Sequence, residues 1–224
     1  MFDDRYQAVI ADTEASKSIH YHLRYRVYCL EKRFEPVDRF EDQMEIDEYD
    51  RRSVHLLIQH KPSGQWVATA RLVLGEPETL PIARFARFSL DGIDIRDKRF
   101  AELSRLSVLK SYRRHGEQQV NEPEVLLGLI RAARDCSAQM GLDYWLFLCR
   151  RSIMRIIGYF GMEMRIIGEP CEHRGIRYPY LGDLANGFDG IAKRSPEVHA
   201  MFSRKNTLIP YSELYPETRI ALAA

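Results

Sequence analysis

Four charged residues stand inside stretches that are otherwise apolar, and their types are those that acid–base and binding chemistry uses. Arg24 lies in the segment LRYRVY, and Arg71 lies in TARLV. Glu102 and Arg105 share the segment ELSRLSV. A charge in such surroundings is costly to bury unless an opposite charge pairs with it. The sequence therefore predicts partners for all four.

Two interpretations of these charges are open. In the first, they form surface salt bridges on a half-exposed sheet. In the second, distant segments bring three arginines and three carboxylates into one cluster, namely Arg24, Arg71 and Arg105 against Asp47, Asp50 and Glu102. Such a cluster keeps carboxylates ionised near an amine nucleophile and assembles one pocket from distant segments.

The elements that would position these residues follow from the spacing of apolar side chains. Helical spacing predicts helices over 14–32, 121–140, 152–160 and 196–203, the first capped by Thr13. Alternation and short apolar runs predict strands over 6–10, 54–59, 66–74, 100–110, 143–149, 162–167 and 177–181. The acidic segment 34–52 has no periodicity and is expected to be a long functional loop.

Hairpin strands followed by alternating helices and strands imply an α/β sandwich with a mixed central sheet flanked by helices. We expect a single domain over 1–224, with a flexible substrate loop at 35–52 and a C-terminal helix and tail at 190–224. No GxGxxG or GxxxxGK[ST] motif occurs, so a doubly wound nucleotide-binding fold is not expected.

Composition narrows the function classes. The 33 lysines and arginines against 32 aspartates and glutamates give a formal net charge of +1, which argues against a dedicated nucleic-acid binder. The four cysteines form no CxxC pair and the seven histidines no HExxH motif, so no metal site or disulfide framework is expected. No leader peptide and no stretch of about 18 apolar residues is present, so we expect a cytoplasmic protein without an integral membrane segment.

Four segments in register resemble the acyl-homoserine-lactone synthase family, whose members adopt the N-acetyltransferase (GNAT) fold. They are LRYRVY at 23–28 followed by Phe34, DEYD at 47–50, TARL at 69–72 and ELSR at 102–105. The resemblance covers the first half of the chain well. It is closer still to the acyltransferases associated with PEP-CTERM/exosortase systems and to N-acyl amino acid synthases, through residues 39–54 and CEHRGIRYPY at 171–180.

The chain departs from the lactone synthases at two aromatic positions and in one loop. Tyr28 and Phe34 stand where that family usually has Phe and Trp, which weakens adenosylmethionine as the amine substrate. GNAT enzymes cradle coenzyme A on backbone amides of a [RQ]xxGx[GA] turn. Residues 113–118, RRHGEQ, offer one glycine and an added carboxylate, which favours a carrier-protein donor over free coenzyme A.

The resemblance implies transfer of a fatty acyl group from acyl carrier protein to the amino group of an amino acid or similar small amine. No tightly bound cofactor is expected, and acyl-phosphopantetheine would be the co-substrate. By resemblance, Glu102 is the general base, and the backbone amides near Ser107 and Val108 are the oxyanion donors. The predicted substrate-binding residues are Arg24, Tyr28, Phe34, Asp47, Asp50, Arg71 and Arg105.

Two further sets of residues complete the prediction. Leu126, Trp145 and Phe147 would line an acyl tunnel, although ordinary core packing explains each of them alone. An acidic carrier protein would dock on a set of basic residues: Lys110, Arg113, Arg114, Arg150, Arg151 and Arg155. The alternative is that these residues form a solvated basic face without a partner.

Two other functions remain open, an acyl-homoserine-lactone synthase using S-adenosylmethionine and a non-catalytic acyl-binding GNAT-like module.

Overall fold

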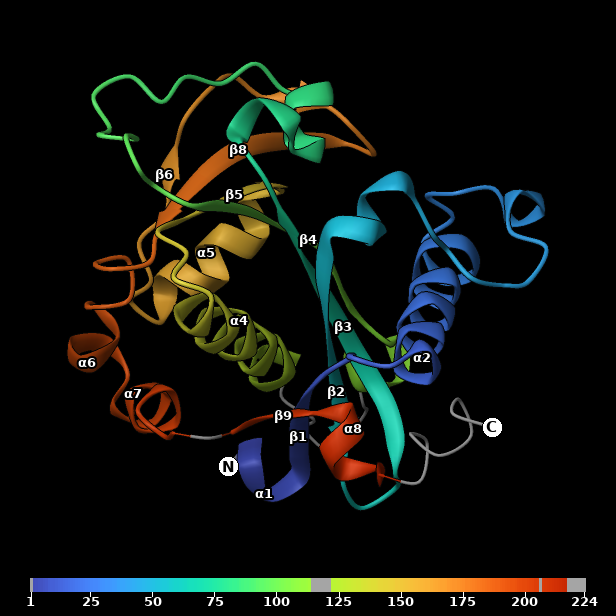
Figure 1. Cartoon of the computed structure of the whole chain (residues 1–224). Coiled ribbons are helices and arrows are strands. Elements are labelled where there is room, and N and C mark those ends of the chain that lie inside the picture. Colours follow the sequence, from blue (N-terminus) through green and yellow to red (C-terminus); the bar gives the residue numbers. More distant parts are fainter. Residues whose placement is uncertain (1, 114–121, 206, 217–224) are drawn as a thin grey trace. The chain divides into compact units, whose positions relative to one another are not determined.

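The computed structural model describes residues 2–113, 122–205 and 207–216 (Figure 1). The chain divides into two compact units. The first comprises residues 1–71, 105–133 and 205–224, and the second comprises residues 72–104 and 134–204.

Nine strands in the described residues form one mixed sheet in the order β6-β8-β5-β4-β3-β2-β1-β9, with β7 paired to β8. Their bounds are Tyr6–Ile10 (β1), Ser53–His60 (β2), Gln65–Leu74 (β3), Phe100–Val108 (β4), Tyr144–Cys149 (β5), Arg165–Ile166 (β6), Cys171–Glu172 (β7), Ile176–Asp183 (β8) and Leu208–Pro210 (β9). Strand β1 pairs antiparallel with β2, whereas β4 pairs parallel with β5. The predicted α/β class with a mixed sheet and flanking helices is confirmed.

The helices are mostly short. The α-helices are Phe2–Arg5 (α1), Glu14–Tyr25 (α2), Lys110–Arg113 (α3), Glu122–Gln139 (α4), Arg151–Tyr159 (α5), Ile191–Arg194 (α6), Pro196–Phe202 (α7) and Tyr211–Leu214 (α8). A π-helical segment spans Arg26–Glu31 (η1), and 3-10 turns span Val37–Arg39 (η2), Glu48–Arg52 (η3), Pro77–Thr79 (η4) and Pro81–Arg84 (η5). In the described residues, no helix is both long enough and apolar enough to span a bilayer.

In the first unit, α2 begins where the sequence predicts. The Thr13 hydroxyl accepts the N–H of Ser16, and the Ser16 side chain accepts the N–H of Thr13, which satisfies two amides of the first turn. The predicted single helix over 14–32 is wrong in its second half, because the hydrogen bonds change to the π pattern from Arg26 onward. Leu23 and Val27 belong to a buried core cluster with Val9, Leu57 and Leu109. This packing determines which face of α2 lies against β2.

The N-terminal helix α1 packs on α4 in the same unit. A Cβ at Gly128 would collide with the Phe2 ring, so only glycine admits this approach. Arg131 of α4 is fully buried and pairs with the Asp3 carboxylate. The chain returns to this unit at β9, which pairs parallel with β1; this strand is absent from the sequence prediction.

In the second unit, β5 pairs antiparallel with β8 from Tyr144 opposite Asp183 to Cys149 opposite Tyr178. The Trp145 indole N–H donates to the Ser137 hydroxyl of α4 at 2.8 Å, so this buried ring has a partner for its polar edge. The strand predicted over 162–167 is shorter than expected, since only Arg165 and Ile166 join the sheet.

Candidate active site

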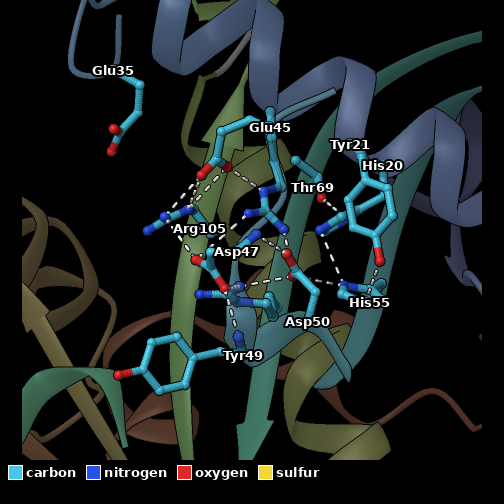
Figure 2. A network of polar contacts seen from close by, with 12 residues as sticks. His20, Tyr21, Glu35, Glu45, Asp47, Tyr49, Asp50, His55, Thr69 and Arg105 are labelled. Atoms are coloured by element: carbon cyan, nitrogen blue, oxygen red, sulfur yellow. Dashed lines mark hydrogen bonds and ion pairs between the residues drawn. The ribbon is translucent and has the colours of Figure 1, made fainter. Parts of the chain in front are cut away.

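A network of ion pairs within the first unit joins α2, the segment before β2, and strands β3 and β4 (Figure 2). The Arg24 and Arg71 side chains have no solvent exposure. The interpretation as surface salt bridges is therefore wrong. The structure brings together five of the predicted cluster residues and one that the prediction omitted: Arg24, Asp47, Asp50, Arg71, Arg105 and Glu45.

Asp50 links two of the arginines. Its Oδ1 accepts from Arg24 Nη1 at 2.6 Å and from Arg71 Nη1 at 2.8 Å, and its Oδ2 accepts the N–H of Asp47 at 2.7 Å. Burial alone would raise the pKa of this carboxyl, but the two guanidinium groups outweigh burial and bring it to about 2. Asp50 is therefore ionised at neutral pH.

Asp47 begins the 3-10 turn η3 and also reaches two arginines. Its Oδ1 accepts the N–H of Tyr49 at 3.0 Å, which caps the turn, and accepts from Arg71 Nη1 at 2.6 Å. Its Oδ2 accepts from Arg105 Nη2 at 2.9 Å. The local cap and the ion pairs therefore fix the same carboxylate.

Glu45 is the residue that sequence reasoning missed. Its carboxylate accepts from Arg24 Nε at 2.5 Å and from Arg105 Nη2 at 2.9 Å, and Glu45 is 1% exposed. Burial would raise its pKa, but Arg24 and Arg105 lower it to about 2. The segment 34–52 holds many carboxylates without periodicity, so no local signal separates Glu45 from its neighbours.

Two buried histidines lie beside Asp50 and form a hydrogen-bonded chain (Figure 2). His20 Nδ1 bonds to the Thr69 hydroxyl, His20 Nε2 lies 3.2 Å from His55 Nδ1, and His55 Nε2 lies 3.4 Å from the Tyr21 hydroxyl. Burial is the main cause that lowers the pKa of both rings, with a contribution from Arg24, and His55 reaches about 4. Both rings are therefore neutral at pH 7, and each uses one nitrogen as donor and one as acceptor.

The two aromatic positions that depart from the lactone synthases lie at one end of the network. The Arg105 guanidinium lies 5.2 Å from the centroid of the Tyr28 ring, and the Tyr28 and Phe34 rings meet edge to face at 5.9 Å. Phe34 also lines a hollow of about 590 Å³ together with Leu30 and Val37.

Glu102 lies in the second unit and is 4% exposed. Its Oε2 accepts the backbone N–H of Ile82, at the turn η5. The prediction that Glu102 faces the three arginines stays a prediction. Ser107 and Val108, in the first unit, are buried at the end of β4, and the Ser107 hydroxyl has no hydrogen-bond partner among the described residues.

The remaining predicted residues divide between the units. Leu126 is buried in the first unit, whereas Trp145 and Phe147 are buried in the second, where they pack on Phe188 and Tyr180. Their role in an acyl tunnel stays a prediction.

Among the predicted docking residues, Lys110 is exposed in the first unit. Arg150, Arg151 and Arg155 are exposed in the second unit, and the latter two line a hollow of about 570 Å³. Arg114 and the rest of the predicted phosphate loop lie outside the described residues, as does the side chain of Arg113.

The charges of the network balance, with three guanidinium groups against three carboxylates. Its members differ in exposure: the side chains of Arg105 and Asp47 are 16% and 18% exposed, whereas the other four are 3% exposed or less. The network therefore presents one cation and one anion, 2.9 Å apart, beside the Tyr28 ring. In the described residues, no group of three or more His, Cys, Asp or Glu side chains is placed to hold a metal ion.

Residues 23–120 match the acetyltransferase (GNAT) domain, a segment that contains all six members of the network. Solved structures support the same fold. BjaI, a CoA-dependent acyl-homoserine lactone synthase solved with SAM and isopentyl-CoA, aligns over 92% of this chain and 93% of its own, with a TM-score of 0.62 and 15% identity.

Two other solved structures have the same fold. The acyl-homoserine lactone synthase LasI aligns over 83% of this chain and 95% of its own, with a TM-score of 0.59 and 16% identity. FeeM, an N-acyl amino acid synthase from uncultured soil microbes, aligns over 81% and 92%, with a TM-score of 0.56 and 11% identity. No curated protein matches the chain in sequence.

At such low identity these likenesses establish the fold and leave the substrates open. The match of residues 23–120 to the acetyltransferase (GNAT) domain agrees with this fold. The predicted GNAT-like architecture is thereby confirmed.

Proposed function

We propose that this enzyme transfers a fatty acyl group from acyl carrier protein to the amino group of an amino acid or similar small amine, forming an N-acyl amide. The likeness to acyl-homoserine lactone synthases and to an N-acyl amino acid synthase supports acyl transfer to an amine. The resemblance to PEP-CTERM/exosortase-associated acyltransferases belongs to the same proposal.

The observation that carries the proposal is the partly exposed pair of Arg105 and Asp47. An amino acid carries a carboxylate and an ammonium group a few atoms apart. The positive charge of the Arg105 guanidinium suits the carboxylate, and the carboxylate of Asp47 suits the ammonium. The Tyr28 ring adds a cation–π contact with the Arg105 guanidinium, 5.2 Å from the ring centroid.

The proposed reaction requires few groups. The ammonium loses a proton to become a nucleophile, its nitrogen forms the amide bond with the thioester carbon, and the carbon–sulfur bond breaks to release the thiol. One proton is released overall. Glu102 is proposed as the base that takes the proton, directly or through a water, and the backbone N–H groups near Ser107 and Val108 are proposed as donors to the oxyanion.

The donor proposal rests on charge and on sequence. Acyl carrier proteins are acidic, and complementary basic residues raise the association rate and make it sensitive to salt. In the second unit, Arg151 and Arg155 border a hollow that Met154 and Ile166 also line. The segment RRHGEQ has one glycine and so departs from the [RQ]xxGx[GA] sequence pattern of the usual phosphate turn, which favours the carrier-protein donor. Acyl-phosphopantetheine is thus proposed as co-substrate, with no tightly bound cofactor.

The test pairs two donors with a panel of acceptors, and the products are identified by mass spectrometry. Acyl carrier protein thioesters and the matching coenzyme A thioesters are each incubated with free amino acids, simple amines and S-adenosylmethionine. We expect N-acyl amino acids and a higher kcat/KM for the carrier-protein donor. An acyl-homoserine lactone as the main product would establish the lactone synthase instead, and no product from any pair would favour a non-catalytic acyl-binding module.

A matched pair of variants tests the docking residues. Arg151→Glu/Arg155→Glu should lower kcat/KM for the carrier-protein donor and leave the coenzyme A donor unchanged. Arg96→Glu, an exposed arginine of the same unit, is the control and should change neither. If the double variant affects both donors equally, the arginines form a solvated face and the carrier-protein assignment fails.

A further inference from the structure

Glu45 holds Arg105 more firmly than any other described carboxylate does. Arg105 Nε lies 3.2 Å from Glu45 Oε1 and 3.1 Å from Oε2, and Arg105 Nη2 lies 2.9 Å from Oε1. Asp47 receives one hydrogen bond from the same guanidinium. Glu45 is also tied to α2, since Oε2 accepts from Arg24 Nε at 2.5 Å and its backbone N–H donates to the Tyr21 carbonyl at 3.2 Å. It therefore connects α2 to the middle of β4.

Arg105 has a backbone conformation that arginine rarely adopts. Its φ is +51°, in the left-handed region, although it lies inside the strand Phe100–Val108. A side chain with a Cβ is disfavoured there, and arginine lacks the short polar group that lets Asn or Asp tolerate the conformation. Such a residue persists only where the surroundings determine its position. The described contacts that do so are the Glu45 and Asp47 carboxylates and the Tyr28 ring.

The left-handed residue changes the strand that follows it. A strand residue with positive φ interrupts the alternation of side chains and of N–H groups, as in a β-bulge, and bends the strand. The sequence predicts unbroken alternation over 100–110, and Arg105 is where the structure departs from it. Ser107 and Val108, whose backbone amides are the proposed oxyanion donors, follow two and three residues later. Their direction depends on the conformation at Arg105.

We propose that Glu45 is a positioning residue for acyl transfer: it clamps the Arg105 guanidinium, thereby holds the left-handed backbone at that position, and so aims the N–H groups at the end of β4. The effect of Glu45 on kcat rests on the proposed function, whereas its effect on the backbone conformation of Arg105 does not. The sequence gives Glu45 no special status, because the clamp exists only when the segment before β2 meets β4.

The test compares Glu45→Gln with Glu41→Gln, an exposed glutamate in the same segment. A glutamine side chain has one acceptor oxygen and no charge, so it cannot receive all the bonds that the Glu45 carboxylate receives. We expect φ of Arg105, followed by backbone chemical shifts or a crystal structure of the variant, to leave the left-handed region. We also expect kcat to fall about 10- to 100-fold with little change in KM for the thioester, as for a misplaced catalytic group. Glu41→Gln should leave both unchanged.

Several outcomes would overturn the proposal. A Glu45→Gln enzyme with a lowered melting temperature but a normal kcat would assign Glu45 a purely structural role. A fall in kcat with φ of Arg105 unchanged would mean that Glu45 acts by another route. If Glu45→Gln does not fold, Glu45→Asp keeps the charge but is one methylene shorter; it should lose part of kcat, and an undiminished kcat would refute the clamp. If the wild-type enzyme acylates no amine, the proposed function fails while the φ measurement still tests the clamp.

Discussion

The buried histidine pair predicts a loss of stability in mildly acidic solution. The pKa of His55 is lowered from 6.5 to about 4 in the folded protein, chiefly by burial, while in the unfolded chain it returns to 6.5. Above pH 6.5 both states are neutral and the full stability is present. As the pH falls, the unfolded state takes up a proton first, so stability is lost until the pH reaches the folded pKa near 4.

The size of this loss follows from the two pKa values. The difference between the unfolded pKa of 6.5 and the folded pKa of about 4 corresponds to about 3 kcal/mol in the free energy of unfolding. About 2 kcal/mol of this is lost between pH 6.5 and pH 5. His20 adds to the loss, because its pKa is also lowered by burial. Glu45 and Asp50 have folded pKa values of about 2 and contribute mainly at lower pH. The interval from pH 6.5 to 5 therefore reports on the histidines.

Urea denaturation at a series of pH values measures this effect as the free energy of unfolding. We expect the wild-type protein to lose at least about 2 kcal/mol between pH 6.5 and 5. His55→Asn keeps a polar group toward His20 but does not titrate in this interval, so its pH dependence should be clearly shallower. His22→Asn, which changes an exposed histidine of the same helix as His20, should keep the wild-type dependence. Equal slopes for wild type and His55→Asn would refute the reasoning.

Three other predictions concern single residues. Arg71→Met removes one of the arginine partners of Asp47 and of Asp50 and leaves a buried carboxylate charge uncompensated, a loss of about 3–5 kcal/mol of stability that should appear as a lower melting temperature, whereas the exposed Arg39→Met should leave the melting temperature unchanged. Glu102→Gln should keep the fold but lose about 10²–10⁴-fold in kcat, and activity within a few-fold of wild type at pH 8 would show that Glu102 is not the base. Ser107→Ala keeps the backbone N–H and removes a hydroxyl without a described partner, so kcat and the melting temperature should both be unchanged. A large fall in kcat would mean that the hydroxyl, and not the backbone amide, takes part in the reaction.

Local sequence was sufficient for the main elements and for most of the network. Thr13 caps α2 as its residue type predicts, and the short apolar runs of β2 and β3 are buried over continuous stretches in the core. Arg24 and Arg71 were identified because a charge inside an apolar run must find a partner if it is buried. That argument depends only on neighbours in the chain, so it needs no knowledge of the fold.

Tertiary structure alone decided the rest, because the interactions responsible join residues far apart in the chain. The short strand β9 has no periodicity to read, and it forms because β1, at the other end of the chain, offers an unpaired edge. Glu45 became a buried member of the network because Arg24 and Arg105 meet there. The left-handed backbone at Arg105 could not be predicted from residue type, because glycine and asparagine are the residues that favour this conformation and neither occupies the position. Side-chain contacts from distant segments hold it, and such contacts come into being only when the chain has folded.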